Sequence, residues 1–169
     1  MARTFRAAAT VTVERDIEDV FAYLAAVTTM DDWVKGVSET RHTGGTPGEV
    51  GATYAYRYRS AGTTRSMEMT VEAVERPTRL VIGVPDGSLA FTSEITLEAV
   101  DGGTRVTNAI DATVTGRGLA LLTAVAPPLV RWLATREMTG ELEQLKSNLE
   151  DEEIAVADDR RRRESTAAA

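Results

Sequence analysis

The chain has 169 residues, of which 43% are hydrophobic and 27% charged, enough for one globular domain with its own hydrophobic core. It contains no cysteine and one histidine, His42. This composition excludes disulfide frameworks, thiolate nucleophiles, zinc fingers and multi-histidine metal sites, and we expect neither a metal nor a cofactor. The net charge of -7 argues against nucleic acid as a partner, because an acidic surface repels phosphate backbones.

The beginning of the chain shows no secretory signal. Polar and apolar residues alternate from Thr4 onward, without the unbroken apolar stretch of a signal peptide, so we expect a cytoplasmic protein. The most apolar segment, Leu119 to Leu133, contains two prolines and an arginine. It is also shorter than the ~20 residues that span a bilayer, so no membrane span is expected.

The first elements expected are a strand and two short helices. Apolar residues at alternate positions from Phe5 to Val13 are typical of a strand with one buried face. Apolar residues at i, i+3, i+4 and i+7 from Ile17 predict a helix, for which Asp16 can supply the N-cap. A second short helix is expected over 29–34, and Gly36 suits the left-handed position that ends it.

From residue 37 to 115, every regular stretch alternates between polar and apolar residues. The breaks between the stretches are rich in glycine and proline, as in short turns. Six strands joined by short turns are an antiparallel meander, and the first strand makes seven. The expected strands of the meander lie at about 37–43, 52–60, 64–75, 79–84, 89–100 and 104–115.

The C-terminal part is expected to be helical. A helical pattern covers about 118–149, but Pro127 and Pro128 remove two amide donors. One helix should therefore stop or bend there, and another should start with proline in its first turn. The segment 150–169 consists mainly of charged blocks and small residues, which extend a helix into solvent or form a tail. We place the domain at 3–149 and a charged, flexible tail at 150–169.

Five stretches carry a family resemblance. They are Ile17–Leu24, Trp33 with Gly36–Val37, Gly48–Gly51, Gly103–Thr107 and Leu142–Lys146. In their order and spacing they resemble the polyketide cyclase/dehydrase branch of the START and pollen-allergen superfamily, called SRPBCC. The resemblance covers about residues 3 to 149.

The resemblance implies an α+β helix-grip fold. In this fold a seven-stranded antiparallel sheet wraps around a long C-terminal helix, and two short helices lie between strands 1 and 2. It also implies a cavity between the sheet and the long helix. The superfamily includes lipid carriers, quinone-binding proteins and aromatase/cyclases, so the fold alone does not assign an activity.

Three tyrosines share one face of an expected strand. Tyr54, Tyr56 and Tyr58 lie at alternate positions and form an apolar wall that carries hydroxyl groups. Such a wall suits a flat or oily ligand with a few polar groups. The alternatives are that the tyrosines pack in the core or lie on the outer face.

The neighbouring strands carry apolar rows with two polar interruptions. Met69 lies in a row with another methionine and a valine, and Phe91 lies in a row that Ser93 interrupts. Asn108 interrupts the row of the last strand. A polar side chain on an apolar face needs a partner, which a ligand, water or the backbone can supply. Alternatively, these polar residues are satisfied structural groups and the methionines fill the core.

The C-terminal helix carries two apolar faces. A stripe with steps of three and four residues is expected to face the sheet. The stripe consists of Val130, Ala134, Met138, Leu142, Leu145 and Leu149. Leu129, Trp132 and Leu133 fall off this stripe. Either 119–133 forms a cavity lid, a dimer contact or a membrane-touching surface, or the proline pair rotates the segment and buries both faces.

Candidates for catalysis are few. His42 is the one histidine available as the base of a serine triad, and its place beside a glycine-rich turn predicts an exposed side chain. Several acids and arginines alternate with apolar residues and are expected to pair on the solvated outer face of the sheet. They are Glu68, Glu72, Glu94 and Glu98, with Arg57, Arg65 and Arg105. The pattern shows no evident buried acid, so the sequence assigns no catalytic residue.

The residues and the resemblance together favour binding or carriage of a small hydrophobic ligand, such as a lipid, an isoprenoid or a polyketide-like aromatic. One alternative is a polyketide cyclase or dehydratase, in which Tyr56, Ser93 or Asn108 would polarise a carbonyl. Another is a protein-interaction module that uses the apolar 119–133 segment, for example in a homodimer. Contact of the same segment with a membrane surface, without spanning it, is a separate alternative. The expected ligand-binding residues are Trp33, Tyr54, Tyr56, Tyr58, Met69, Phe91, Ser93, Asn108 and Leu129.

Overall fold

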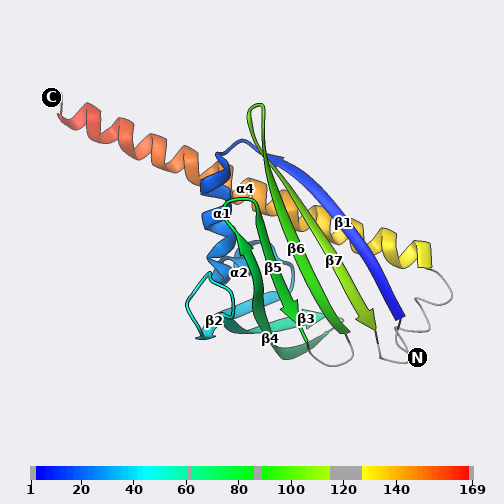
Figure 1. The fold of residues 1–169 in the computed structure, drawn as a ribbon. Coiled ribbons are helices and arrows are strands. Elements are labelled where there is room, and N and C mark those ends of the chain that lie inside the picture. The colour runs from blue at the N-terminus through cyan, green and yellow to red at the C-terminus, as the bar shows by residue number, and fades with distance from the viewer. Residues whose placement is uncertain (1–2, 61, 86–88, 115–126, 168–169) are drawn as a thin grey trace.

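The strands form a continuous antiparallel sheet. The computed structural model describes residues 3–60, 62–85, 89–114 and 127–167, and within these residues seven strands pair in the order β1-β7-β6-β5-β4-β3-β2. The expected meander is confirmed, and the first strand joins it beside the last (Figure 1). The strands are β1 (Arg3–Val13), β2 (Val37–Gly44), β3 (Thr53–Ser60), β4 (Thr63–Glu75), β5 (Arg79–Val84), β6 (Leu89–Val100) and β7 (Gly103–Val114).

Short helical elements connect β1 to β2. The helix α1 (Ile17–Ala25) buries the side that its apolar spacing predicts, and Asp16 occupies the N-cap without a capping bond from its side chain. The second helix is shorter than expected. A 3-10 turn, η1 (Val27–Thr29), leads into α2 (Met30–Trp33), and the backbone is already extended at Val34.

The long helix α4 (Pro127–Ala167) begins at the proline pair, where the missing amide donors favour a helix start. The part of the expected helix at 118–126 lies outside the described residues. The predicted stripe is confirmed, because its members from Met138 to Leu149 are buried in the common core. α4 runs along β1 and also contacts α2 (Figure 1). The arrangement is the expected helix-grip fold.

The two faces of the sheet differ, as the alternation of side chains in strands requires. The inner face, toward α4, carries the buried rows, including Tyr54, Leu97 and Val106. The outer face carries acids and arginines. His42 is exposed, as predicted, and its ring lies edge-on to Tyr54 with 5.3 Å between ring centroids.

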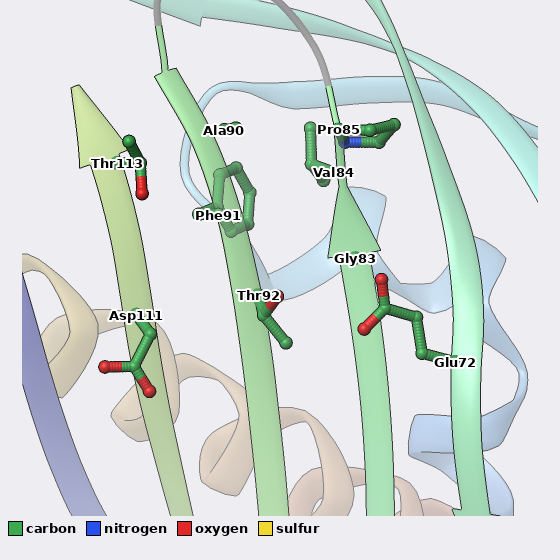
Figure 2. Close-up of a pocket in the computed structure, with 9 residues that line it drawn as sticks. All are labelled: Glu72, Gly83, Val84, Pro85, Ala90, Phe91, Thr92, Asp111 and Thr113. Atoms are coloured by element: carbon green, nitrogen blue, oxygen red, sulfur yellow. The ribbon is translucent and has the colours of Figure 1, made fainter. Parts of the chain in front are cut away.

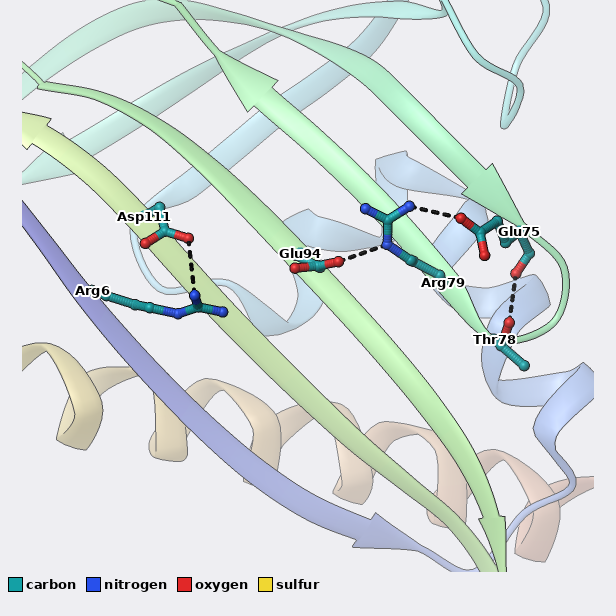
Figure 3. A network of polar contacts seen from close by, with 6 residues as sticks. All are labelled: Arg6, Glu75, Thr78, Arg79, Glu94 and Asp111. Atoms are coloured by element: carbon teal, nitrogen blue, oxygen red, sulfur yellow. Dashed lines mark hydrogen bonds and ion pairs between the residues drawn. The ribbon is translucent and has the colours of Figure 1, made fainter.

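Ion pairs cover part of the outer face. Arg79 binds Glu94 with 2.6 Å between Nε and Oε1 and binds Glu75 with 2.8 Å between Nη1 and Oε1 (Figure 3). Arg105 pairs with Glu98 at 2.7 Å, as predicted. Arg57 pairs with Glu39 of β2 at 3.4 Å instead of with the predicted acids. Partly exposed pairs of this kind typically contribute less than ~1 kcal/mol each.

Gly36 lies against the backbone of β3 at the turn between α2 and β2. Its φ of +81° is the left-handed conformation expected from the sequence, and an added Cβ would lie 2.5 Å from the carbonyl oxygen of Arg59. The Arg59 N–H donates to the Gly36 carbonyl at 2.8 Å, so the two backbones cannot separate without straining this bond. We expect Gly36→Ala to lower the free energy of unfolding by about 2 kcal/mol or more.

Gly62→Ala is the matched control for this substitution. Gly62 has a φ of +79°, but nothing lies within 4 Å of an added Cβ. The Gly62→Ala variant should lose only about 1 kcal/mol of its free energy of unfolding, the cost of an alanine in the left-handed conformation. Urea denaturation of both variants therefore isolates the clash at Gly36, and equal losses would show that the β3 backbone moves aside without cost.

Candidate functional site

The inner face of the sheet is filled at one end and partly open at the other. At the filled end, Val13, Leu97 and Val106 are at most 4% exposed. At the opposite end, inner-face side chains on several strands are only half-buried. We call this region the open end, and its residues are Tyr58, Met67, Phe91, Ser93 and Ile110.

The first turns of α4 lie toward the open end. At the filled end, the Glu14 N–H donates to Glu150 at 3.0 Å, which places the later part of α4 at the end of β1. The helix runs back along β1 from there. Its inward residues Val130 and Ala134 are half-buried, whereas Met138 is buried. The sheet and the start of α4 are therefore less tightly filled than the rest of the core.

The three tyrosines of β3 share one face of the strand, as its parity predicts, and the structure places that face on the inside of the sheet. Tyr54 and Tyr56 are buried. The Gly48 N–H donates to the Tyr54 hydroxyl at 3.1 Å, and the Tyr56 hydroxyl lies 3.7 Å from the Met67 sulfur. Tyr54 belongs to the filled core, as does the predicted residue Met69. Tyr58 reaches the open end.

Ser93 and Asn108 are partners of each other. The Ser93 hydroxyl donates to Asn108 Oδ1 at 2.8 Å, from β6 to β7. Asn108 is buried and Ser93 is half-buried. No hydrogen bond from the Asn108 amide nitrogen to another described residue is present. The pair is thus a polar site on an apolar wall, and its Asn108 amide can still donate a hydrogen bond.

Trp33 and Leu129 have opposite surroundings. Trp33 lies in α2 and is buried, and its Nε1 has no hydrogen-bond partner within the described ranges. A buried N–H of this kind normally binds water or a ligand. Leu129 is 49% exposed on α4. The structure therefore gathers the predicted apolar residues in and around one core, with Leu129 outside it.

A partly buried acid lies where α4 passes the end of α2. The Lys35 backbone N–H donates to Glu141 Oε1 at 3.2 Å, and Lys35 Nζ pairs with Glu137 at 2.7 Å. Burial raises the pKa of Glu141 to about 7; the bond from Lys35 opposes this rise, and Glu137 adds to it. Burial, and then the charge of Glu141, raise the pKa of Tyr58. An acid that ionises near neutral pH therefore interacts with Tyr58 at the open end.

No acid is among the fully buried residues of the described ranges, but Glu141 is half-buried, which the sequence pattern did not single out. This residue follows Met138 by three positions and precedes Leu145 by four, so it lies at the edge of the apolar stripe. Helical spacing therefore indicated that the Glu141 side chain lies beside the buried stripe. Its burial depends on α2 packing against α4, a tertiary contact that spacing along one helix cannot show.

A depression of about 180 Å³ lies on the outer face, on the other side of the sheet from the open end (Figure 2). Glu72 and Asp111 stand on its two sides, with Gly83 and Thr92 between them. These residues have the parity opposite to the buried rows, which places them on the outer face. Phe91 is the one predicted ligand-binding residue that lines it.

The family follows from a match along most of the chain. The family model described as "Polyketide cyclase / dehydrase and lipid transport" matches residues 4–150. The chain belongs to this family. No curated protein matches it.

Several solved structures share the fold of this family member at low sequence identity. TTHA0849 from Thermus thermophilus has a TM-score of 0.71 and 14% identity, covering 86% of this chain and 97% of that one. The di-domain ARO/CYC StfQ from the steffimycin biosynthetic pathway has a TM-score of 0.69 and 14% identity, covering 90% of this chain and 52% of that one. Ara h 8.0201 has a TM-score of 0.64 and 15% identity, covering 89% and 99%. These likenesses show the fold alone.

The family description names both enzymes and lipid transport. The activity of this family member therefore has to be argued from its own residues. In the part of the chain that the structure describes, no group of three His, Cys, Asp or Glu side chains is placed to hold a metal ion. None of the described helices is long and apolar enough to cross a membrane.

Proposed function

We propose that this protein binds a small, largely hydrophobic ligand at the open end, between the inner face of the sheet and α4, and that it does so in the cytoplasm. A lipid, an isoprenoid or a polyketide-like aromatic has the required chemistry. The observation that carries the proposal is the half-buried apolar wall of Met67, Phe91 and Ile110, which continues a face that is elsewhere filled. An apolar surface that remains partly wet is stabilised when an apolar ligand covers it.

Polar groups at the wall would orient the ligand. The Ser93–Asn108 pair has donor capacity left over beside the apolar rows, and Tyr58 carries a hydroxyl at the open end. Trp33, on α2 rather than on the wall itself, carries a buried N–H that lacks a partner among the described residues. A few polar groups on an apolar wall are typical of small-molecule sites. A ligand with a carbonyl or hydroxyl group at one end is therefore favoured over a plain hydrocarbon.

A cyclase or dehydratase activity is the second candidate, and Glu141 is the observation in its favour. Proton transfer near neutral pH requires a group whose pKa lies near the working pH, and burial raises the pKa of Glu141 to about 7. Binding takes precedence because side chains from several strands support it, whereas the chemistry would rest on one acid.

Ile110→Trp tests the proposed site. Ile110 is a half-buried inner-face residue of β7, so a larger side chain there should fill the space that a ligand would occupy. We expect binding of the fluorescent probe ANS to weaken at least about tenfold, equivalent to ~1.4 kcal/mol. Native mass spectrometry should also show an apolar mass co-purifying with the wild type and depleted in the variant.

Asp111→Trp is the matched control. It is the next residue of the same strand, points to the outer face and is exposed, so ANS binding should stay within about twofold of the wild type. Circular dichroism of both variants checks that the fold is kept. Equal loss of binding in the two variants, or a wild type that binds neither ANS nor any co-purifying mass, would refute the open end as the site.

A further inference from the structure

An apolar surface faces away from the sheet on the first described turns of α4. Leu129, Trp132 and Leu133 are 49%, 55% and 46% exposed. They follow the i, i+3, i+4 spacing that places residues on one side of a helix. We call these three residues the outward patch. The alternative in which the proline pair buries both faces of this segment therefore does not hold for its described part.

The outward patch lies in a locally basic segment of an acidic protein. Residues 128–136 contain Arg131 and Arg136 and no acid, although the whole chain has a net charge of -7. The Arg136 guanidinium carbon lies 5.5 Å from the centroid of the Trp132 ring, so positive charge is held directly beside the apolar side chains. An occupant of this surface has to accept apolar groups and also supply negative charge.

We infer that the outward patch docks on the surface of a lipid bilayer that contains anionic lipids. Helices that lie in a membrane interface combine Trp and Leu on the buried side with arginines that reach the headgroups. A second copy of this chain fits less well, because a two-fold contact would bring Arg131 and Arg136 of both copies together without an acid from the same segment. The bilayer meets both requirements, since it offers an apolar interior below a layer of negative charge.

The position of the patch connects docking to the open end. The same turns of α4 carry Val130 and Ala134 on the inward side, next to the half-buried rows of the sheet. Docking would therefore hold the opening of the proposed ligand site close to the bilayer, a source of hydrophobic ligands. Docking itself requires no ligand. Only the placement of the ligand site near the bilayer rests on the proposed function.

Vesicle flotation tests the inference with the full chain and no added ligand. We expect the wild type to float with phosphatidylcholine vesicles that contain phosphatidylglycerol, and to bind phosphatidylcholine alone at least about tenfold more weakly. The double variant Trp132→Ala, Leu133→Ala should lose at least about tenfold in affinity for the anionic vesicles. Arg131→Gln, Arg136→Gln should lose about tenfold as well and remove most of the salt dependence.

Val50→Ala is the control, because Val50 is 61% exposed but lies outside α4, and it should bind as the wild type does. A wild type that does not float with anionic vesicles, or a Trp132–Leu133 double variant that floats equally well, would overturn the inference. Light scattering that shows a homodimer which this double variant dissociates would also overturn it, in favour of a second copy. Since ANS binding at the open end is measured separately, either proposal can fail without the other.

Discussion

Leu142→Ala is expected to lower the free energy of unfolding by about 3 kcal/mol. Leu142 lies in the middle of the α4 stripe, is 1% exposed and belongs to the core shared with the sheet. Truncation would remove apolar contacts and leave a cavity that the surrounding strands cannot fully close. Urea denaturation followed by circular dichroism measures the loss.

Leu133→Ala provides the comparison, with the same change on the same helix. Leu133 is 46% exposed on the outward patch, so its truncation should alter stability by no more than about 0.5 kcal/mol. A similar loss in the two variants would contradict the orientation of α4 against the sheet, since only one of the two leucines packs in the core.

Glu141→Gln is expected to stabilise the protein at alkaline pH by up to about 3 kcal/mol. Burial raises the pKa of Glu141 from 4.5 to about 7, so the folded state binds this proton more tightly than the unfolded state does. The contribution of this group to stability is therefore complete below pH 4.5, falls as the pH rises toward 7 and is lost above that. Glutamine stays neutral, and its carbonyl can still accept the bond from the Lys35 backbone.

The difference in stability between Glu141→Gln and the wild type should accordingly be small below pH 4.5, grow as the pH rises toward 7, and level off above that. Denaturation curves at a series of pH values measure it. Glu143→Gln is the control, because it makes the same change at an exposed residue of α4, where a substitution should alter stability by no more than about 0.5 kcal/mol. Parallel pH profiles of Glu141→Gln and the wild type would show that Glu141 is not buried by α2.

Much of the fold was predictable because its signals are local. Alternation of apolar residues depends on strand geometry alone, so the strands of the meander and the common face of Tyr54, Tyr56 and Tyr58 could be predicted from the residues. The start of α4 at Pro127 follows equally from the lack of an amide donor. The second helix was harder, since an element of one turn carries too few positions for a clear period.

The candidate site was predictable only in part. Ser93 and Asn108 could be singled out as polar residues on apolar rows, but their mutual hydrogen bond depends on the register between β6 and β7. Glu141 was missed because its burial requires α2. The outward position of Leu129 depends on how α4 is rotated against the sheet, which a helical pattern with two apolar faces leaves open.

By itself, then, the amino-acid sequence determined the strand and helix order and which side chains of a strand share a face, because these depend on neighbours a few positions apart. Tertiary structure alone decided whether the second apolar face of α4 is also covered, which polar groups find partners, and where the inner face stays unfilled. Those outcomes depend on contacts between segments distant in the chain, such as Glu14 with Glu150 and Lys35 with Glu141. The local spacing of apolar residues cannot predict such contacts.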